Sequence, residues 1–167
     1  MPNRGNFSDP EIERAFPSTI PEFERAGRCF AYDEPTACVF HLMRVLDYGL
    51  KSLAVNLGTT YDSQSWQTVG NYIETRMREK YQTKTEEWKK SEPLYAEALT
   101  DIQAIGKSHR NPSLHRIDKT YDDREAYHLI TIVEGFMRHL AKGGLSEKKP
   151  VLQSRGDDPL GRVLSRA

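Results

Sequence analysis

The sequence lacks the features that mark secreted, disulfide-linked and membrane-spanning proteins. It has only two cysteines in 167 residues, Cys29 and Cys38, which is too few for a disulfide framework. No apolar run approaches the ~18 residues needed to cross a bilayer. The segment Met1–Pro10 is polar and has no apolar stretch typical of a secretory signal. We therefore expect a cytoplasmic protein that does not associate with membranes.

The chain also lacks a surplus of either charge. It has 24 Lys and Arg residues and 24 Asp and Glu residues, so its formal net charge is zero. This balance excludes a uniformly basic surface that would bind nucleic acids by bulk charge, although a local basic site remains compatible with it. Apolar residues make up 37% of the chain and charged residues 29%, which indicates a helical protein with wide polar faces.

Common motifs for metal, phosphate and nucleophile sites are missing too. The glycines are scattered and form no phosphate-binding loop, and neither a Cys-x-x-Cys nor a His-Glu-x-x-His pair occurs. No two of the five histidines are four residues apart on one predicted helix face. The sequence therefore predicts neither a metal site nor a cofactor.

Apolar residues at helical spacing predict an all-α fold. The clearest stripe follows Pro35, runs from Val39 to Leu57 in steps of three and four residues, and stops at Gly58. Further stripes cover 20–32, 66–81, 94–105 and 126–140, and no strand-like alternation is visible. We predict a single antiparallel bundle of four long helices, with a short irregular segment before the last helix.

Local signals predict where two of these helices begin and where the bundle ends. Ser91 and Pro93 predict the start of the helix over 94–105, and Thr120 with Asp123 resembles a capping box for the last helix. Residues 1–18 contain three prolines and are interpreted as a flexible arm with one helical turn. Residues 19–142 form the bundle, and 143–167 form a flexible or partner-docking tail.

The segment before the last helix contains the strongest chemical signal in the sequence. Arg110, Asn111 and His115 lie within six residues, and Pro112 suits the first position of a helical turn that Asn111 would cap. Arginine presents a fork of donors that matches phosphate, and histidine exchanges protons near neutral pH. Cleavage of RNA by its own 2′-hydroxyl needs a group that transfers protons and a cation that stabilises the negative charge of the phosphate. It needs no metal.

The segment Arg110–His115 resembles the Arg-x-x-x-x-His signature of HEPN domains, which often have a polar residue directly after the arginine. The stretches 37–46 and 135–141 are also similar to helices of small bacterial HEPN-like proteins, so the resemblance covers residues 20–142. It implies a helical bundle that dimerises, with the two motifs facing each other across the dimer cleft. Many members are metal-independent endoribonucleases of toxin–antitoxin, abortive-infection or other antiviral defence systems, and others only bind partners.

Carried over to this chain, the resemblance implies that His115 transfers the proton, Arg110 holds the scissile phosphate and Asn111 orients one of them. Pro112 is a departure that stiffens the motif. Arg44 on the predicted second helix can add to RNA binding, although such a residue is more often part of a solvated face. His109 can assist the motif or be a surface residue.

Two other functions stay open at this point. One is a non-catalytic helical interaction module, such as an antitoxin-like or scaffold subunit, and the other is a bundle that binds nucleotides without cleaving them. The proposed ribonuclease would act as a homodimer, with any antitoxin or regulator encoded as a separate protein. Trp66 and Trp88 can stack on bases, but we expect them to pack in the core or at an interface.

Overall fold

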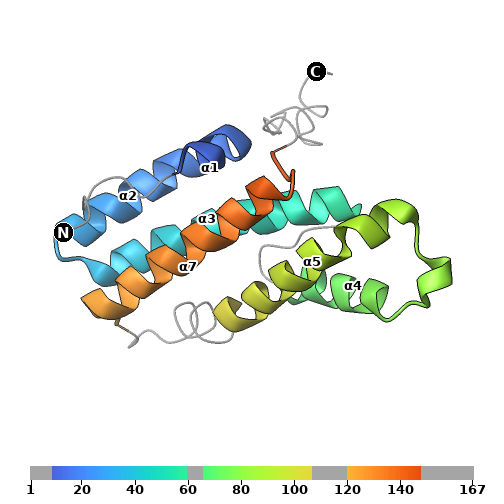
Figure 1. Ribbon diagram of the computed structural model, residues 1–167. Coiled ribbons are helices and arrows are strands. Elements are labelled where there is room, and N and C mark those ends of the chain that lie inside the picture. The colour runs from blue at the N-terminus through green and yellow to red at the C-terminus, as the bar shows by residue number, and fades with distance from the viewer. Residues whose placement is uncertain (1–8, 60–65, 107–119, 148–167) are drawn as a thin grey trace, which may run out of the picture.

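A computed structural model describes residues 9–59, 66–106 and 120–147, and every regular element in these ranges is a helix (Figure 1). The all-α prediction is confirmed for this part of the chain. None of its helices is both long and apolar enough to cross a membrane.

Helices α3 (Pro35–Leu57) and α7 (Asp123–Lys142) form the centre of the molecule. Both start at the same end and run side by side in the same direction (Figure 1). At the shared end, the Tyr121 amide donates a hydrogen bond to Thr36 Oγ1 over 3.0 Å. The expected antiparallel arrangement is therefore wrong for this pair, because α5 runs back in the direction opposite to α3 before α7 begins (Figure 1).

Glycine allows these two helices to approach closely at their middle. A Cβ atom at Gly49 of α3 would lie 2.6 Å from Met137 Sδ and 3.2 Å from Phe136 Cε1 on α7. Both α7 side chains are buried in the main hydrophobic cluster. At its other end α3 stops at Gly58, whose left-handed φ of 69° is the conformation that favours glycine after a helix.

The N-terminal residues pack on this centre more tightly than their composition suggests. Helix α1 (Pro10–Ala15) lies against α7, and a 3₁₀ turn, η1 (Pro17–Thr19), leads into α2 (Ile20–Ala31), which covers α3. Ile12 and Phe16 are fully buried. The arm expected over 1–18 is therefore part of the core from α1 onward, because these two side chains supply the apolar surface that anchors it.

The first residues of the expected tail are likewise anchored. Leu145 is buried, and the Glu147 amide donates a hydrogen bond to the Ala15 carbonyl over 2.9 Å. The Glu147 carboxylate also accepts a hydrogen bond from the Ser18 hydroxyl over 2.8 Å. Residues 143–147 therefore continue the folded body rather than beginning a tail.

Helices α4 (Gln67–Met77) and α5 (Glu86–Ile105) form a hairpin, joined through the 3₁₀ turn η2 (Tyr81–Thr83). The predicted start of α5 at Ser91 and Pro93 is wrong. The helix begins two turns earlier because Thr85 Oγ1 accepts a hydrogen bond from the Trp88 amide, and Pro93 lies inside it. Trp66 and Trp88 are both buried, as expected for core residues.

The start of α7 is also shifted from its prediction. Asp122, not Thr120, caps the helix. Its carboxylate accepts a hydrogen bond from the Glu125 amide over 2.8 Å, and the Asp122 amide donates one to the Glu125 carboxylate over 3.0 Å. Glu134 and Arg138 form an ion pair one turn apart on α7. The helix ends at Lys142, directly before Gly143 and Gly144.

Candidate functional site

The predicted catalytic residues Arg110, Asn111 and His115, together with His109, lie outside the described residues. The structure describes the residues on either side of segment 107–119. Ile105, the last residue of α5, is buried, and Tyr121, just before α7, is buried as well. The C-terminal end of α5 and the N-terminal end of α7 point to the same end of the molecule (Figure 1). Tyr121 lies at the end at which α3 begins, where its amide donates a hydrogen bond to Thr36. Gly106 at the end of α5 instead lies beside Trp66, which donates a hydrogen bond to Asp47 halfway along α3.

Arg44 is the one predicted binding residue that the structure describes. It lies on α3 with 64% of its side chain exposed, and its Nε atom is 3.7 Å from Glu22 Oε2. At this distance the guanidinium has a carboxylate beside it, but most of its donors still face solvent. Arg44 therefore keeps donors exposed to solvent, and its predicted role in RNA binding stays a prediction.

Glu22 gathers basic side chains from two helices. Its carboxylate is almost fully buried on α2, and it accepts a hydrogen bond from Arg25 Nη1 over 2.6 Å. His41 Nδ1 on α3 lies 2.7 Å from the other carboxylate oxygen. An ionised carboxylate accepts only, so this contact requires the proton on Nδ1. We call Glu22, Arg25, His41 and Arg44 the Glu22 cluster.

The Glu22 cluster has a positive excess at the surface. One carboxylate faces two guanidinium groups, so the cluster has a net charge of +1 even when His41 is neutral. Arg25 is about half exposed and Arg44 more so, while the acid is buried beneath them. The exterior of the cluster therefore presents donors, and the acid that orients them is hidden from a ligand.

Sequence reasoning did not identify Glu22 or Arg25. A signal was available, since Glu22 precedes Ala26 and Phe30 by four and eight residues on the predicted helix over 20–32 and so shares their apolar face. A buried carboxylate must find cationic or hydrogen-bonding partners. Nothing in the sequence indicates that these partners include His41, because that contact joins residues 19 positions apart.

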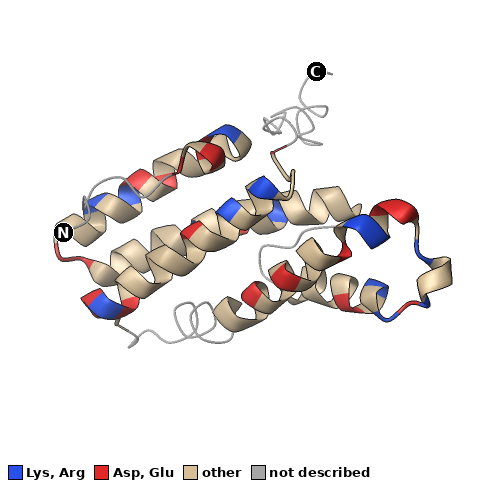
Figure 2. Ribbon diagram, in the orientation of Figure 1, with Lys and Arg blue, Asp and Glu red and all other residues tan. Residues whose placement is uncertain are grey.

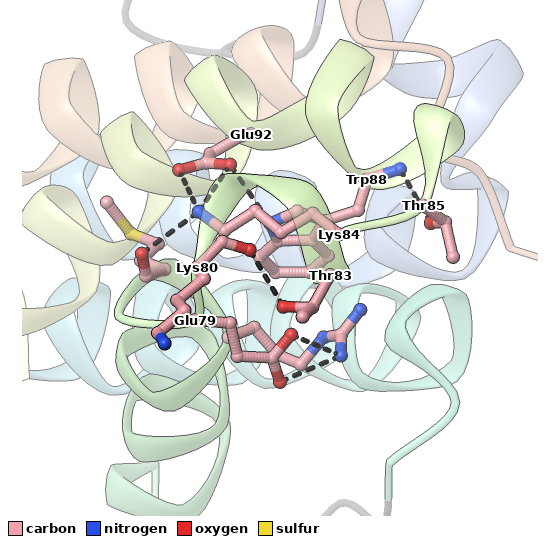
Figure 3. A network of polar contacts seen from close by, with 9 residues as sticks. Glu79, Lys80, Thr83, Lys84, Thr85, Trp88 and Glu92 are labelled. Carbon is pink, nitrogen blue, oxygen red and sulfur yellow. Dashed lines mark hydrogen bonds and ion pairs between the residues drawn. The ribbon is translucent and has the colours of Figure 1, made fainter.

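A second polar network joins the turn between α4 and α5, as Figure 3 shows. The Lys84 ammonium is buried and contacts the Met77 carbonyl over 2.9 Å and the two Glu92 oxygens over 2.7 and 2.9 Å. Trp88 Nε1 donates to the same carboxylate over 3.1 Å. Three acceptor atoms match the three donors of a lysine ammonium, so this group has no donor left for a substrate. The network stabilises the hairpin.

A third polar group lies between α5 and α7. His139 Nε2 is 3.4 Å from Glu97 Oε2, outside good hydrogen-bond geometry. Burial, together with the charge of Glu97, raises the pKa of Asp101 on the same face of α5 above its ordinary value of 3.8. Asp101 and Glu97 are one turn apart, and acidic residues recur along α5 (Figure 2). This surface is unsuited to a phosphate.

Cys38 is not suited to nucleophilic catalysis. Cys38 is fully buried in α3, and burial raises the pKa of its thiol to about 12, so the thiolate is not formed near neutral pH. No disulfide joins it to the half-buried Cys29. Across residues 9–59, 66–106 and 120–147, no three His, Cys, Asp or Glu side chains are grouped as metal ligands.

Comparison with known proteins gives no relative for this chain. No family model matches it, and neither a curated protein nor a solved structure matches it significantly.

Proposed function

We propose that this chain is a metal-independent endoribonuclease of the HEPN type. The observation that carries the proposal is the position of the Arg110–His115 motif: it lies between α5 and α7, and its segment is held at both ends by buried residues, Ile105 and Tyr121. A rigid scaffold that presents a short polar segment is the usual setting of a catalytic site. HEPN domains place their motif in the corresponding part of a helical chain.

The reaction is a transesterification within the RNA. The 2′-hydroxyl oxygen attacks the adjacent phosphorus, the bond to the 5′-oxygen breaks, and the products are a 2′,3′-cyclic phosphate and a free 5′-hydroxyl. His115 transfers the proton, Arg110 stabilises the negative charge that develops on the phosphate, and Asn111 orients one of the two. No metal or cofactor takes part in these steps.

The proposal includes the setting implied by the HEPN resemblance. The enzyme acts as a homodimer that brings two motifs to one cleft, in a toxin–antitoxin or phage-defence system in the cytoplasm. Its regulator is then a separate protein. Arg44 and His109 bind the RNA beside the catalytic residues.

The test is a cleavage assay with the purified full-length protein, single-stranded RNA and a chelator. We expect cleavage with a 2′,3′-cyclic phosphate end, and a loss of at least about a hundredfold in rate for His115→Ala, as for removal of a general acid or base. His128→Ala is the matched control, since His128 is exposed on α7, and it should cleave like the wild type. A wild type that cleaves no RNA, or a His115→Ala variant that cleaves as fast as the control, would refute the proposal.

The second candidate is a non-catalytic interaction module, which is favoured by exposed aromatic side chains. Tyr32 is 79% exposed after α2 and Tyr81 is 69% exposed in the turn of the hairpin. Large exposed apolar groups of this kind are common where proteins bind one another. This candidate predicts a stable protein complex that survives the combined changes Arg110→Ala and His115→Ala, and pull-down followed by gel filtration measures it.

A further inference from the structure

The exposed residues of α3 form a single stripe along the helix. Five positions of α3 are exposed: Phe40, Arg44, Tyr48, Lys51 and Val55. They follow one another in steps of four, four, three and four residues, so they lie on one face of the helix. We call this face the α3 stripe.

The α3 stripe alternates apolar groups with cations and contains no carboxylate. Phe40 and Tyr48 are 42% and 37% exposed, although rings of this size are normally more deeply buried in a core helix. Arg44 lies between them in sequence, and Lys51 follows Tyr48. Asp47, the one acid within α3, is half-buried and accepts a hydrogen bond from Trp66 Nε1 over 2.8 Å. The charge on the stripe is therefore positive only.

Part of this positive charge lies in the Glu22 cluster. Arg44 belongs to both surfaces, and Arg25 on α2 extends the positive charge sideways. Because the shared carboxylate is buried, a ligand on the surface meets the two guanidinium groups rather than the acid. Arg25, whose Nη1 already donates a hydrogen bond to this carboxylate, loses less conformational entropy when it binds a phosphate.

We propose that the α3 stripe binds single-stranded RNA and leads it to the catalytic segment. Arg44 and Lys51 contact the phosphates, and the rings of Phe40 and Tyr48 stack on bases, as in other proteins that bind single strands. Eight helical residues separate the rings by ~12 Å, which leaves room for nucleotides between them. This inference rests on the proposed ribonuclease function and identifies how its substrate is held.

The direction of the stripe supports this path. Phe40 lies one turn after Thr36, and Thr36 Oγ1 accepts the hydrogen bond from the Tyr121 amide. The stripe therefore begins at the end of the molecule where Tyr121 follows segment 107–119, and it extends along α3 away from that end. A strand bound along the stripe extends toward Tyr121.

Charge selects an anionic strand over a second copy of the chain. In a symmetric contact between two α3 stripes, Arg44 and Lys51 would meet a surface that is equally free of carboxylates. The desolvated cations would have no partner there. A nucleic acid strand supplies both the phosphates for the cations and the flat bases for the rings.

The experiment separates binding from cleavage by using single-stranded DNA, which lacks the 2′-hydroxyl and cannot be cleaved by this reaction. We would measure binding of a fluorescent oligonucleotide to the full-length protein by anisotropy over a range of salt concentrations. The test variant combines Arg44→Gln and Lys51→Gln. The matched control combines Arg78→Gln and Lys80→Gln, which remove two exposed cations from the far end of α4.

We expect the test variant to bind at least about tenfold more weakly at low salt. Its salt slope should decrease by about 1.4, since each phosphate contact with a single strand contributes ~0.7. Phe40→Ala and Tyr48→Ala should each weaken binding about fivefold or more while leaving the salt slope unchanged, because a stacked base contributes through its ring. The control should bind like the wild type, and circular dichroism checks that every variant is folded.

The outcomes distinguish this inference from the proposed function. If the wild type cleaves RNA but the test variant binds as tightly as the control, the α3 stripe is not the binding path, while the ribonuclease stands. If the stripe variants lose binding but the wild type cleaves nothing, the ribonuclease fails and the binding surface stands. Loss of an acidic protein partner by the test variant, with nucleic acid binding unchanged, would also overturn the inference.

Discussion

The close approach of α3 and α7 makes one substitution informative. Gly49 and Gly135 both lie inside long helices, and alanine at either position would gain about 1 kcal/mol of helix propensity. At Gly135 an added Cβ meets nothing within 4 Å. At Gly49 it would lie 2.6 Å from Met137 Sδ and 3.2 Å from Phe136 Cε1. The two variants therefore differ in packing and share the propensity gain.

The packing cost at Gly49 is set by how far its neighbours can move. Met137 is fully buried and Phe136 nearly so, so neither side chain can turn into solvent. Forcing a methyl group into a filled core costs about 1–3 kcal/mol. We therefore expect Gly135→Ala to raise the free energy of unfolding by about 1 kcal/mol. Gly49→Ala should be less stable than Gly135→Ala by about 1–3 kcal/mol.

Urea denaturation followed by circular dichroism measures this difference directly. The melting temperatures of the variants should follow the same order, and each kcal/mol should change the melting temperature by about 2–4 °C in a chain of this size. A second comparison tests the cause: in a Met137→Ala background, the methyl group at position 49 should stabilise the protein, because it enters space that the shorter side chain leaves. If Gly49→Ala raises stability as much as Gly135→Ala in the wild-type background, the close approach of the helices is wrong.

Two further predictions concern buried or paired charges. Lys84→Met should lower the free energy of unfolding by about 2–3 kcal/mol, because the Glu92 carboxylate loses its charged partner. Lys90→Met, an exposed control on the same helix as Glu92, should change the free energy by less than about 0.5 kcal/mol in the same urea titration. At Asp9, hydrogen bonds from the Glu11 amide and from Arg138 hold the pKa below its ordinary value of 3.8. The ionised carboxylate stabilises the fold above that value and loses its effect as the pH falls through the lowered pKa, so Asp9→Asn should lower the melting temperature at pH 7 and match the wild type in strong acid. Parallel curves of melting temperature against pH would contradict this account.

The elements that could be predicted from the sequence are those with strong local signals. The long apolar stripe of α3 and the glycine at 58 define that helix without any tertiary information, and the observed φ of 69° at Gly58 explains the stop. The start of α5 was missed because Pro93, a common first residue of helices, competes with the weaker signal of Thr85. The buried ring of Trp88 holds the earlier turn in place, and its burial is a tertiary property.

Features that depend on long-range contacts could not be predicted. The parallel run of α3 and α7 follows from the α4–α5 hairpin, whose direction the helical periods do not encode. Lys84 occurs in a charged stretch that is typical of a solvated surface, yet its ammonium is enclosed by the Met77 carbonyl and Glu92. A lysine can be buried only where all its donors are satisfied, and that depends on the tertiary fold.

The candidate site shows the same division between local and long-range information. The motif at 110–115 is a local pattern, and so is the exposed position of Arg44 on α3. What distinguishes Arg44 from an isolated solvated cation is the buried Glu22 on another helix, whose carboxylate lies 3.7 Å from Arg44 Nε and also accepts a hydrogen bond from Arg25. The bond from Tyr121 to Thr36 adds the remaining link, since it ties the end of segment 107–119 to the start of the α3 stripe. Cleavage of a strand requires that its phosphates be held relative to the reacting groups, because a bound substrate reacts fast only when its geometry is fixed. In the proposed enzyme, the helix that would hold these phosphates also contacts Tyr121, two residues after segment 107–119, so the binding surface and this flank of the segment belong to one rigid element.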